Sequence, residues 1–386
     1  MVVNMNNLKE IVPYRISQAR ISRGLSMAEL ADLVDVSKQA ISQYETGKST
    51  PSDSVINKIA RYLKYNVDFF RKPMPVTNAA ESGIFFRSNK TARQKDLSAA
   101  EVKIQILREI NDYLRTYVNF PEVNLPKIDY VDCGIDTISN DTIEQYATIL
   151  RNSWKLGNGP IVNLMNVVQK NGIVVSSTKL RLKKLDGLSE WYNNTPYIFI
   201  STDKETNCRL RFGIAHEIGH LLMHAGNFSP EEIRNDTIHQ KLENEAHRFA
   251  GAFLLPKETF SKDVYSTSLD HFVQLKAKWK VSISAMIKRC ETLCIFSPSQ
   301  IKYLKDQMTR RGYWTHEPLD SEMPVEQPFA HKQAVSLLLD NNIITPYEFV
   351  QSIGCLPEEL EQYCCLDKNM LSYFEPNQVV SLRRVK

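Results

Sequence analysis

The chain has 386 residues, a length that predicts two or three domains. Hydrophobic residues make up 42% and charged residues 24%, values that exclude disordered, collagenous and fibrous proteins. The 48 Lys and Arg exceed the 44 Asp and Glu by too little to indicate nucleic-acid binding by themselves. The seven cysteines form no CxxC pair, and the N-terminus lacks the pattern of a signal peptide. We therefore expect a cytoplasmic protein with no membrane partner.

The pattern of residues 13–70 predicts four or five short helices whose ends are marked by capping and turn residues. Ser26, followed three residues later by Glu29, is a capping box, and Ser37 caps the helix that comes next. Within that helix, the spacing predicts a buried face made by Ala40, Ile41 and Tyr44. The remaining side chains face outward and are of the kind that read base edges: Lys38, Gln39, Ser42 and Gln43.

The run RISQARISRGLSMAELADLVDVSKQAISQYETGKSTPS resembles the helix-turn-helix domain of the lambda-repressor-like (Cro/C1, or XRE) family. The resemblance covers residues 13–70 and implies that residues 37–46 form the recognition helix for a double-stranded DNA operator, with Lys48 beyond it near a phosphate. Since one such domain reads a half-site, a homodimer is expected. Residues 1–72 hold 11 Lys and Arg against 7 Asp and Glu, so they carry the whole excess charge. A helical bundle with a solvated polar face, or a domain that binds protein, is the alternative.

The segment NCRLRFGIAHEIGHLLMHAG contains the pattern HExxH at residues 216–220. On a helix, residues four apart are separated by about 40° in azimuth, so His216 and His220 project from one face at a spacing suited to one Zn²⁺. Glu217 lies beside them, where it can take a proton from water activated by the metal. The preceding strand PYIFIS, residues 196–201, is expected to lie beside a bound peptide.

Catalytic zinc needs a third protein ligand, for which HQKLENEAHRFAGAFLLP, residues 239–256, offers candidates. Glu243 shares the inward face of the helix that this segment predicts. Glu245 is rotated from it by roughly 200° and is expected to point toward solvent. His224 and His247 are alternative ligands or would orient the substrate.

This region contains HEIGHLLMH and, beginning 23 residues after the second His of HExxH, the pattern E-x-x-A-x-x-F-A followed by LLP. On these residues it resembles the ImmA/IrrE family of zinc metallopeptidases, of gluzincin type. The resemblance covers about residues 143–312. It implies Glu217 as catalytic base and three zinc ligands: His216, His220 and Glu243. His247 stands where the family usually has Asn or Asp. Together with the N-terminal resemblance, this matches a known fusion of an XRE regulator with such a peptidase.

The expected fold class is α+β multidomain, built from a helix-turn-helix domain, a mainly helical gluzincin-like domain with a small β-sheet, and a helical C-terminal segment. The sheet would include GIVVSS and PYIFIS, the latter after an Asn193-Asn194 turn, and the aromatic pair Phe85-Phe86 would brace the two domains. Residues 278–293 look like a second helix-turn-helix, for which we favour a structural role over a DNA contact. The predicted domains are residues 1–72, 73–142 (a linker with an amphipathic helix), 143–312 and 313–386.

These features favour a DNA-bound regulator that carries a zinc endopeptidase and cleaves a regulatory protein, either a partner repressor or itself. The selectivity of cleavage is expected to reside in residues 313–386. One alternative is a regulator whose metallopeptidase-like domain senses a ligand, metal or partner without cleaving anything. Another is an antitoxin-like binding module.

Overall fold

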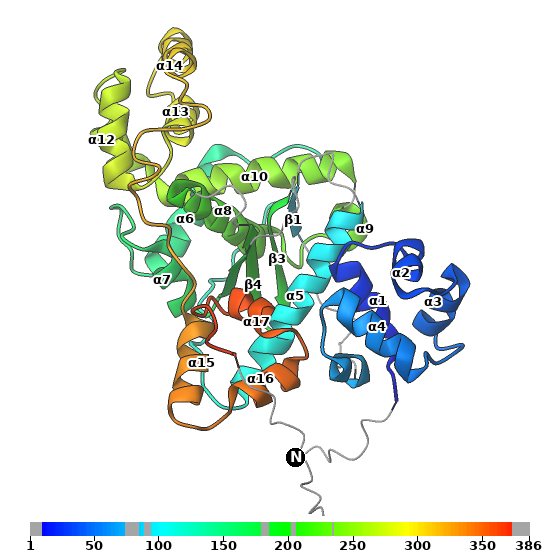
Figure 1. The fold of residues 1–386 in the computed structure, drawn as a ribbon. Coiled ribbons are helices and arrows are strands. Elements are labelled where there is room, and N and C mark those ends of the chain that lie inside the picture. Colours follow the sequence, from blue (N-terminus) through cyan, green and yellow to red (C-terminus); the bar gives the residue numbers. More distant parts are fainter. Residues whose placement is uncertain are drawn as a thin grey trace, which may run out of the picture. The chain divides into compact units, whose positions relative to one another are not determined.

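A computed structural model of the chain describes residues 10–73, 85–88, 94–178, 185–201, 206–233 and 235–372. Its contacts divide the chain into two compact units (Figure 1). The terminal unit consists of residues 1–77, 94–119 and 329–386, and the central unit of residues 78–93 and 120–328. This grouping differs from the four consecutive ranges expected, because the C-terminal segment packs with the N-terminal helices.

The terminal unit begins with four short helices, namely α1 Pro13–Ser22, α2 Met27–Val34, α3 Lys38–Glu45 and α4 Asp53–Leu63. The capping box of Ser26 and Glu29 is present, and Asp35 adopts a left-handed conformation with φ 58° in the turn before α3. Ser37 caps α3 by accepting a hydrogen bond from the backbone N–H of Ala40. The buried face of α3 is narrower than predicted. Ile41 is buried, whereas Ala40 and Tyr44 are half-buried.

The C-terminal segment completes the core of the terminal unit. After the short helix η2 Val67–Arg71, the further elements of this unit are α5 Gln94–Arg115, α15 Ala330–Asp340, α16 Pro346–Ile353 and α17 Pro357–Tyr363. The backbone N–H of Asn66 donates to Gly354 O at 2.9 Å, and Arg23 pairs with Glu359 at 2.7 Å. Gly354 has φ 85°, and a Cβ there would lie 2.8 Å from Phe69 Cβ. This close approach requires glycine and fixes residues 329–372 against the N-terminal helices.

The central unit contains a four-stranded sheet in the described residues, in the order β1-β3-β4-β2. Its strands are β1 Phe85–Ser88, β2 Val174–Thr178, β3 Leu185–Tyr192 and β4 Thr195–Ser201. Asn193 and Asn194, both with positive φ, join the antiparallel strands β3 and β4, as predicted for a tight hairpin. The strand PYIFIS is β4, which has β3 on one side and β2 on the other. The expectation that it lies beside a bound peptide is therefore wrong, because both its edges are already paired.

Helices cover this sheet and extend beyond it. They are α6 Asn140–Ser153, α7 Leu164–Lys170, α8 Asn207–Gly219, the π-helical turn η3 His220–His224, α9 Pro230–Ile233, α10 Asp236–Leu254, α11 Lys257–Asp263, α12 Leu269–Trp279, α13 Ile283–Thr292 and α14 Pro298–Arg310. Helix α8 packs on β3 and β4 and also on α10. A Cβ on Gly219 would come within 3.3 Å of Ala246 Cα, so this glycine allows α8 and α10 to cross closely.

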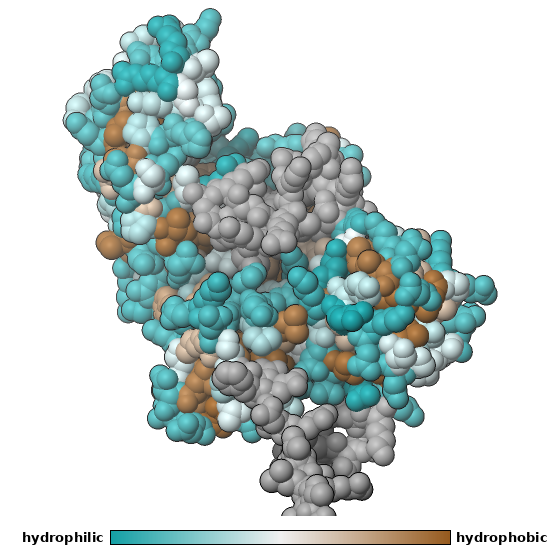
Figure 2. Space-filling view, viewed as in Figure 1, coloured by the Kyte–Doolittle hydropathy of each residue, from teal (hydrophilic) through white to brown (hydrophobic). Residues whose placement is uncertain are grey.

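The strand β1 pairs with β3 through its backbone, but its side chains lie outside the described part of the chain. The proposed bracing by Phe85 and Phe86 therefore stays a prediction. Figure 2 shows apolar residues interspersed among hydrophilic ones on the visible face of both units. Within the described ranges, every helix is too short or too polar to cross a membrane.

Candidate functional site

The last turn of α8, the π-helical turn and α10 bring together the three predicted metal ligands. His216 Nε2 lies 3.1 Å from His220 Nε2, and the Glu243 carboxylate oxygens lie 3.4 and 3.2 Å from these two nitrogens. The donor atoms all lie within 4.8 Å of one another. Separations of this size fit three ligands around a tetrahedral ion with bonds of about 2.0–2.2 Å, and two imidazoles with a carboxylate form a set that zinc accepts.

The carboxyl group of Glu243 is ionised in this arrangement. Burial alone would raise the pKa of this group, but the closeness of the His216 and His220 rings outweighs burial and holds the pKa well below the ordinary value. Both histidines are buried, with exposed fractions of 0% and 1%. His216, His220 and Glu243 are therefore a preformed, largely dehydrated cluster that could hold a metal ion.

Glu217 occupies the next face of α8 and is completely buried. The Ser189 hydroxyl on β3 donates a hydrogen bond to its Oε2 at 2.7 Å. On the same strand, a Cβ at Gly187 would lie 2.9 Å from Glu217 Oε1. Sequence reasoning missed both β3 residues. The Asn193-Asn194 turn was the feature that could have revealed them, since a two-residue turn needs a strand on each side.

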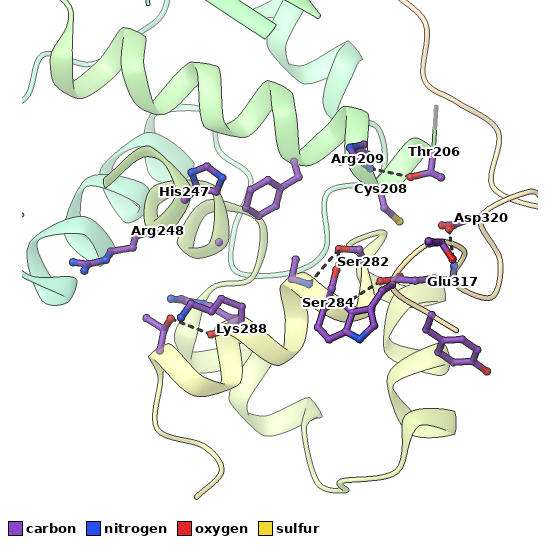
Figure 3. A pocket seen from close by; sticks show the side chains of 18 of the residues that line it. Thr206, Cys208, Arg209, His247, Arg248, Ser282, Ser284, Lys288, Glu317 and Asp320 are labelled. Atoms are coloured by element: carbon purple, nitrogen blue, oxygen red, sulfur yellow. Dashed lines mark hydrogen bonds between the residues drawn. The ribbon is translucent and has the colours of Figure 1, made fainter. Parts of the chain in front are cut away.

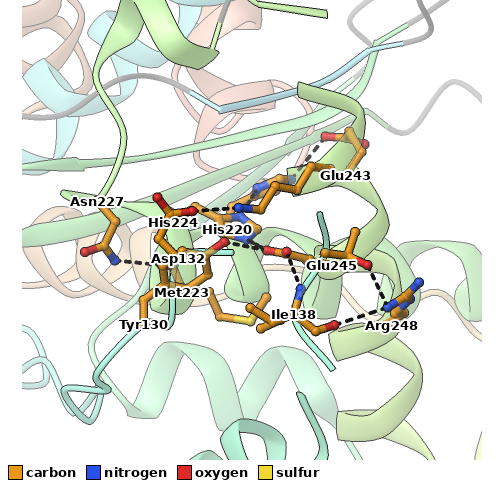
Figure 4. Close-up of polar contacts among 12 residues, drawn as sticks. Tyr130, Asp132, Ile138, His220, Met223, His224, Asn227, Glu243, Glu245 and Arg248 are labelled. Carbon is orange, nitrogen blue, oxygen red and sulfur yellow. Dashed lines mark hydrogen bonds and ion pairs between the residues drawn. The ribbon is translucent and has the colours of Figure 1, made fainter. Parts of the chain in front are cut away.

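The prediction that Glu245 points toward solvent is wrong. This carboxylate is fully buried and accepts hydrogen bonds from His224 Nε2 at 3.1 Å, the Tyr130 hydroxyl at 2.8 Å and the Ile138 N–H at 2.9 Å (Figure 4). The reason is that α10 packs against α8 on one side and against α6 on another, so more than one of its faces is inside. A single amphipathic stripe could not predict this second buried face.

The hydrogen bonds of His224 determine where the protons lie. Its Nε2–H donates to Glu245, so its Nδ1 carries the lone pair and accepts from the Nδ1–H of His220 at 2.9 Å. Burial lowers the pKa of His224 to about 4 despite the opposing effect of Glu245, so this ring is neutral. The tautomer of His220 then leaves its Nε2 lone pair facing His216 and Glu243.

His247 lies next to the trio but outside it. Its ring centroid is 4.5 Å from that of His216, and its Nδ1–H donates to the backbone oxygen of Glu243 at 2.8 Å. Because His247 is exposed, it can contact a substrate.

The predicted base-reading residues lie on or beside α3. Lys38, Gln39 and Lys48 are exposed, and Ser42 and Gln43 are half-buried. The oxygen of Ser37 caps the helix and is thus engaged with backbone. At the other end of α3, Glu45 forms a bidentate pair with Arg20 of α1, with distances of 2.6 and 2.8 Å. This pair fixes the direction of α3 relative to the rest of the bundle.

Comparisons with known proteins assign a class to each region. The model of the M78 peptidase family, described as the IrrE N-terminal-like domain, matches residues 168–291, and a helix-turn-helix model matches residues 16–70. The chain therefore joins a helix-turn-helix region of the DNA-binding, transcription-regulator class to an IrrE-like domain of a metallopeptidase family.

A curated relative is the SPbeta prophage-derived uncharacterized HTH-type transcriptional regulator YonR of Bacillus subtilis (strain 168). It is 31% identical over 58 residues, which cover 15% of this chain and 54% of that relative. The chain thus spans about half the length of the relative that it matches.

Proposed function

We propose that this protein is a DNA-binding regulator whose central unit is a zinc-dependent endopeptidase that cleaves a regulatory protein. The substrate would be a partner repressor or a copy of the chain itself. The observation that carries the proposal is the pairing of the His216, His220 and Glu243 ligand set with a buried carboxylate, Glu217, held by Ser189. A metal site kept only for structure does not need this additional carboxylate.

The proposed chemistry assigns a distinct task to each side chain. Zinc held by the trio would supply a Lewis acid that lowers the pKa of water and polarises a peptide carbonyl. Glu217 is placed to take the proton from the attacking water and to pass it to the nitrogen that leaves as an amine. Ser189 holds one oxygen of that carboxylate, which orients the other. His224 and Glu245 keep His220 in the tautomer that can ligate.

For the terminal unit, we propose that α3 enters the major groove of an operator in the cytoplasm. Gln39 and Gln43 would pair with adenine edges, Lys38 with guanine, and Ser42 with either kind of base. Lys48, just beyond the helix, would contact a phosphate. Because one such helix reads one half-site, binding would involve a homodimer.

The experiment compares the full-length chain with Glu217→Gln and His216→Ala. Each is purified, its zinc content is measured by mass spectrometry, and it is incubated with candidate repressors of the helix-turn-helix class and with tagged wild-type chain. We expect the wild type to bind zinc and cleave, Glu217→Gln to bind zinc without cleaving, and His216→Ala to do neither. Glu231→Gln is the control, because Glu231 is exposed on α9.

Cleavage that survives in Glu217→Gln would contradict the assigned base. Gene regulation that survives in Glu217→Gln and is lost in His216→Ala would instead identify a metal-dependent sensor.

A further inference from the structure

A cavity of about 720 Å³ lies within the central unit, with His247 in its wall (Figure 3). Its walls come from α8, α10, α13 and the chain after α14. His247 and Phe212 line it, and the ring of His247 also contacts that of His216. None of the three proposed ligands lines the cavity, so His247 is the residue that connects its wall with them. The cavity volume is within the range of about 300–1,000 Å³ that is usual for ligand sites.

The acidic side chains in the wall are already occupied by internal partners. Glu317 and Asp320 both accept from Lys276 Nζ, which is fully buried. Glu317 also accepts the backbone N–H groups of Ile283 and Ser284 at the start of α13, at 2.7 and 3.0 Å. A buried cation and a helix N-terminus thus balance these carboxylates. They are not available to bind a cationic ligand.

The basic side chains in the wall have fewer partners of opposite charge than the acidic ones. Arg289 pairs with Glu144, and Lys288 pairs with Glu291. Arg209 and Arg248, by contrast, have no carboxylate partner among the residues that the structure describes. Arg209 is exposed, and Arg248 makes only hydrogen bonds to Thr137 and Ile138 at 3.2 and 3.3 Å. The cavity therefore has a positive bias, concentrated on guanidinium groups that favour carboxylates.

We propose that this cavity binds an acidic stretch of the polypeptide substrate, close to the bond that is cut. The inference rests on the proposed peptidase function and adds its substrate class. An extended chain that passes from the metal ligands along His247 would bring its carboxylate side chains to Arg209 and Arg248. Phe212 and the half-exposed Trp314 supply apolar wall for the intervening residues.

The same geometry argues against a DNA contact by α13, the helix in the second helix-turn-helix-like segment. Its polar residues Ser284 and Lys288 face the cavity, where α8 and α10 form the opposite wall. A duplex needs an open convex helix face, whereas a single extended peptide strand needs only a channel.

The test measures binding in the zinc-loaded, full-length Glu217→Gln chain, so that substrate is retained. The probe is a short fluorescein-labelled peptide with paired Glu residues, compared with the same peptide carrying Gln. In anisotropy titrations we expect the Glu peptide to bind more tightly. Arg209→Gln and Arg248→Gln, added singly, should each weaken it by about fivefold. Lys302→Gln, which removes an exposed cation on α14 outside the cavity, is the matched control.

Equal binding of the Glu and Gln peptides, or equal weakening in Lys302→Gln, would overturn the inference. The inference would also be overturned if duplex DNA displaced the peptide and if this displacement were lost in Arg209→Gln, because the cavity would then bind nucleic acid. If the Glu peptide binds selectively but the wild-type chain cleaves no candidate substrate, the proposed site for acidic peptides stands and the proposed peptidase function fails. If the wild type cleaves substrates at a rate that neither arginine substitution changes, the peptidase function stands and the proposed acidic-peptide site fails.

Discussion

The Nε2 atom of His224 lies 3.1 Å from the Oε2 atom of Glu245, and both side chains are completely buried. Glu245 itself is held by Tyr130 and by the backbone of Ile138. Because His224 also accepts from His220, the carboxylate acts on a proposed zinc ligand through one intervening ring. Groups that orient ligands in this way influence metal affinity without touching the metal.

Glu245→Gln should therefore raise the zinc dissociation constant by about tenfold. The amide oxygen of the substituted side chain would still accept a hydrogen bond from His224. Because it lacks the negative charge of the carboxylate, it would stabilise less the tautomers of His224 and His220 that leave the His220 Nε2 lone pair free for zinc. Competition with a chromophoric chelator measures the affinity, and Glu231→Gln on the exposed surface of α9 is the control. A merely structural role would lower the thermal stability of the zinc-free chain and leave the affinity unchanged, which would refute the relay.

Gly187→Ala should impair cleavage while zinc stays bound. The added Cβ would lie 2.9 Å from Glu217 Oε1 and 3.0 Å from Ile200 Cδ1, so the carboxylate must move away from its present position. Since a well-placed general base contributes about 10²–10⁴-fold, we expect the turnover rate to fall by tenfold or more. Gly159→Ala is a matched control, because a Cβ there meets nothing within 4 Å. Full activity in Gly187→Ala would show that Glu217 tolerates displacement and is not the base.

The HExxH pattern and helical periodicity were enough to predict that His216, His220 and Glu243 face inward, and the resemblance implied that the three meet at one site. Periodicity was insufficient for Glu245, since it identifies one buried face and α10 has more than one. It was likewise insufficient for Ser189 and Gly187. Their importance depends on how a strand lies beneath a helix, which is a long-range relationship.

The same limit applies to the terminal unit. Capping residues such as Ser26 and Ser37 act locally, so their helices could be predicted from short stretches of sequence. The packing of residues 329–372 on the N-terminal helices depends on contacts such as Arg23 with Glu359. Partners more than 300 positions apart leave no local pattern, and only the folded chain brings them together.

Two variants in and beside α3, the helix proposed to read the operator, should weaken DNA binding in different ways. Gln39→Ala removes a side chain proposed to read a base edge, so it should cost about 1–3 kcal/mol on the operator and relax the preference at one base pair. Lys48→Ala removes a proposed phosphate contact, so it should weaken binding to all duplexes alike. It should also lower, by about 1, the magnitude of the slope of the logarithm of the binding constant against the logarithm of the salt concentration. Mobility-shift titrations over a range of salt concentrations measure both. An unchanged sequence preference in Gln39→Ala would exclude it from base reading.

Acidification should loosen the terminal unit through His331, a buried residue of α15. Burial, aided by the nearby charge of Arg115, lowers the pKa of His331 to about 4, against about 6.5 in an unfolded chain. The unfolded chain therefore takes up the proton first as the pH falls. The stabilising contribution is complete above about pH 6.5 and is lost progressively down to about pH 4, by at most about 3 kcal/mol.

Hydrogen exchange of peptides from residues 330–340, corrected for the intrinsic effect of pH on exchange, measures this loss. His331→Gln can still donate to Asn111, which now lies 3.2 Å from His331 Nε2, and it does not titrate. This variant should lose less protection than the wild type between pH 6.5 and 4, whereas His316→Gln, at an exposed position, should behave as the wild type does. Parallel pH profiles for wild type and His331→Gln would mean that the buried ring is protonated without cost, and the acid sensitivity would then belong to carboxylates that lose their ion pairs.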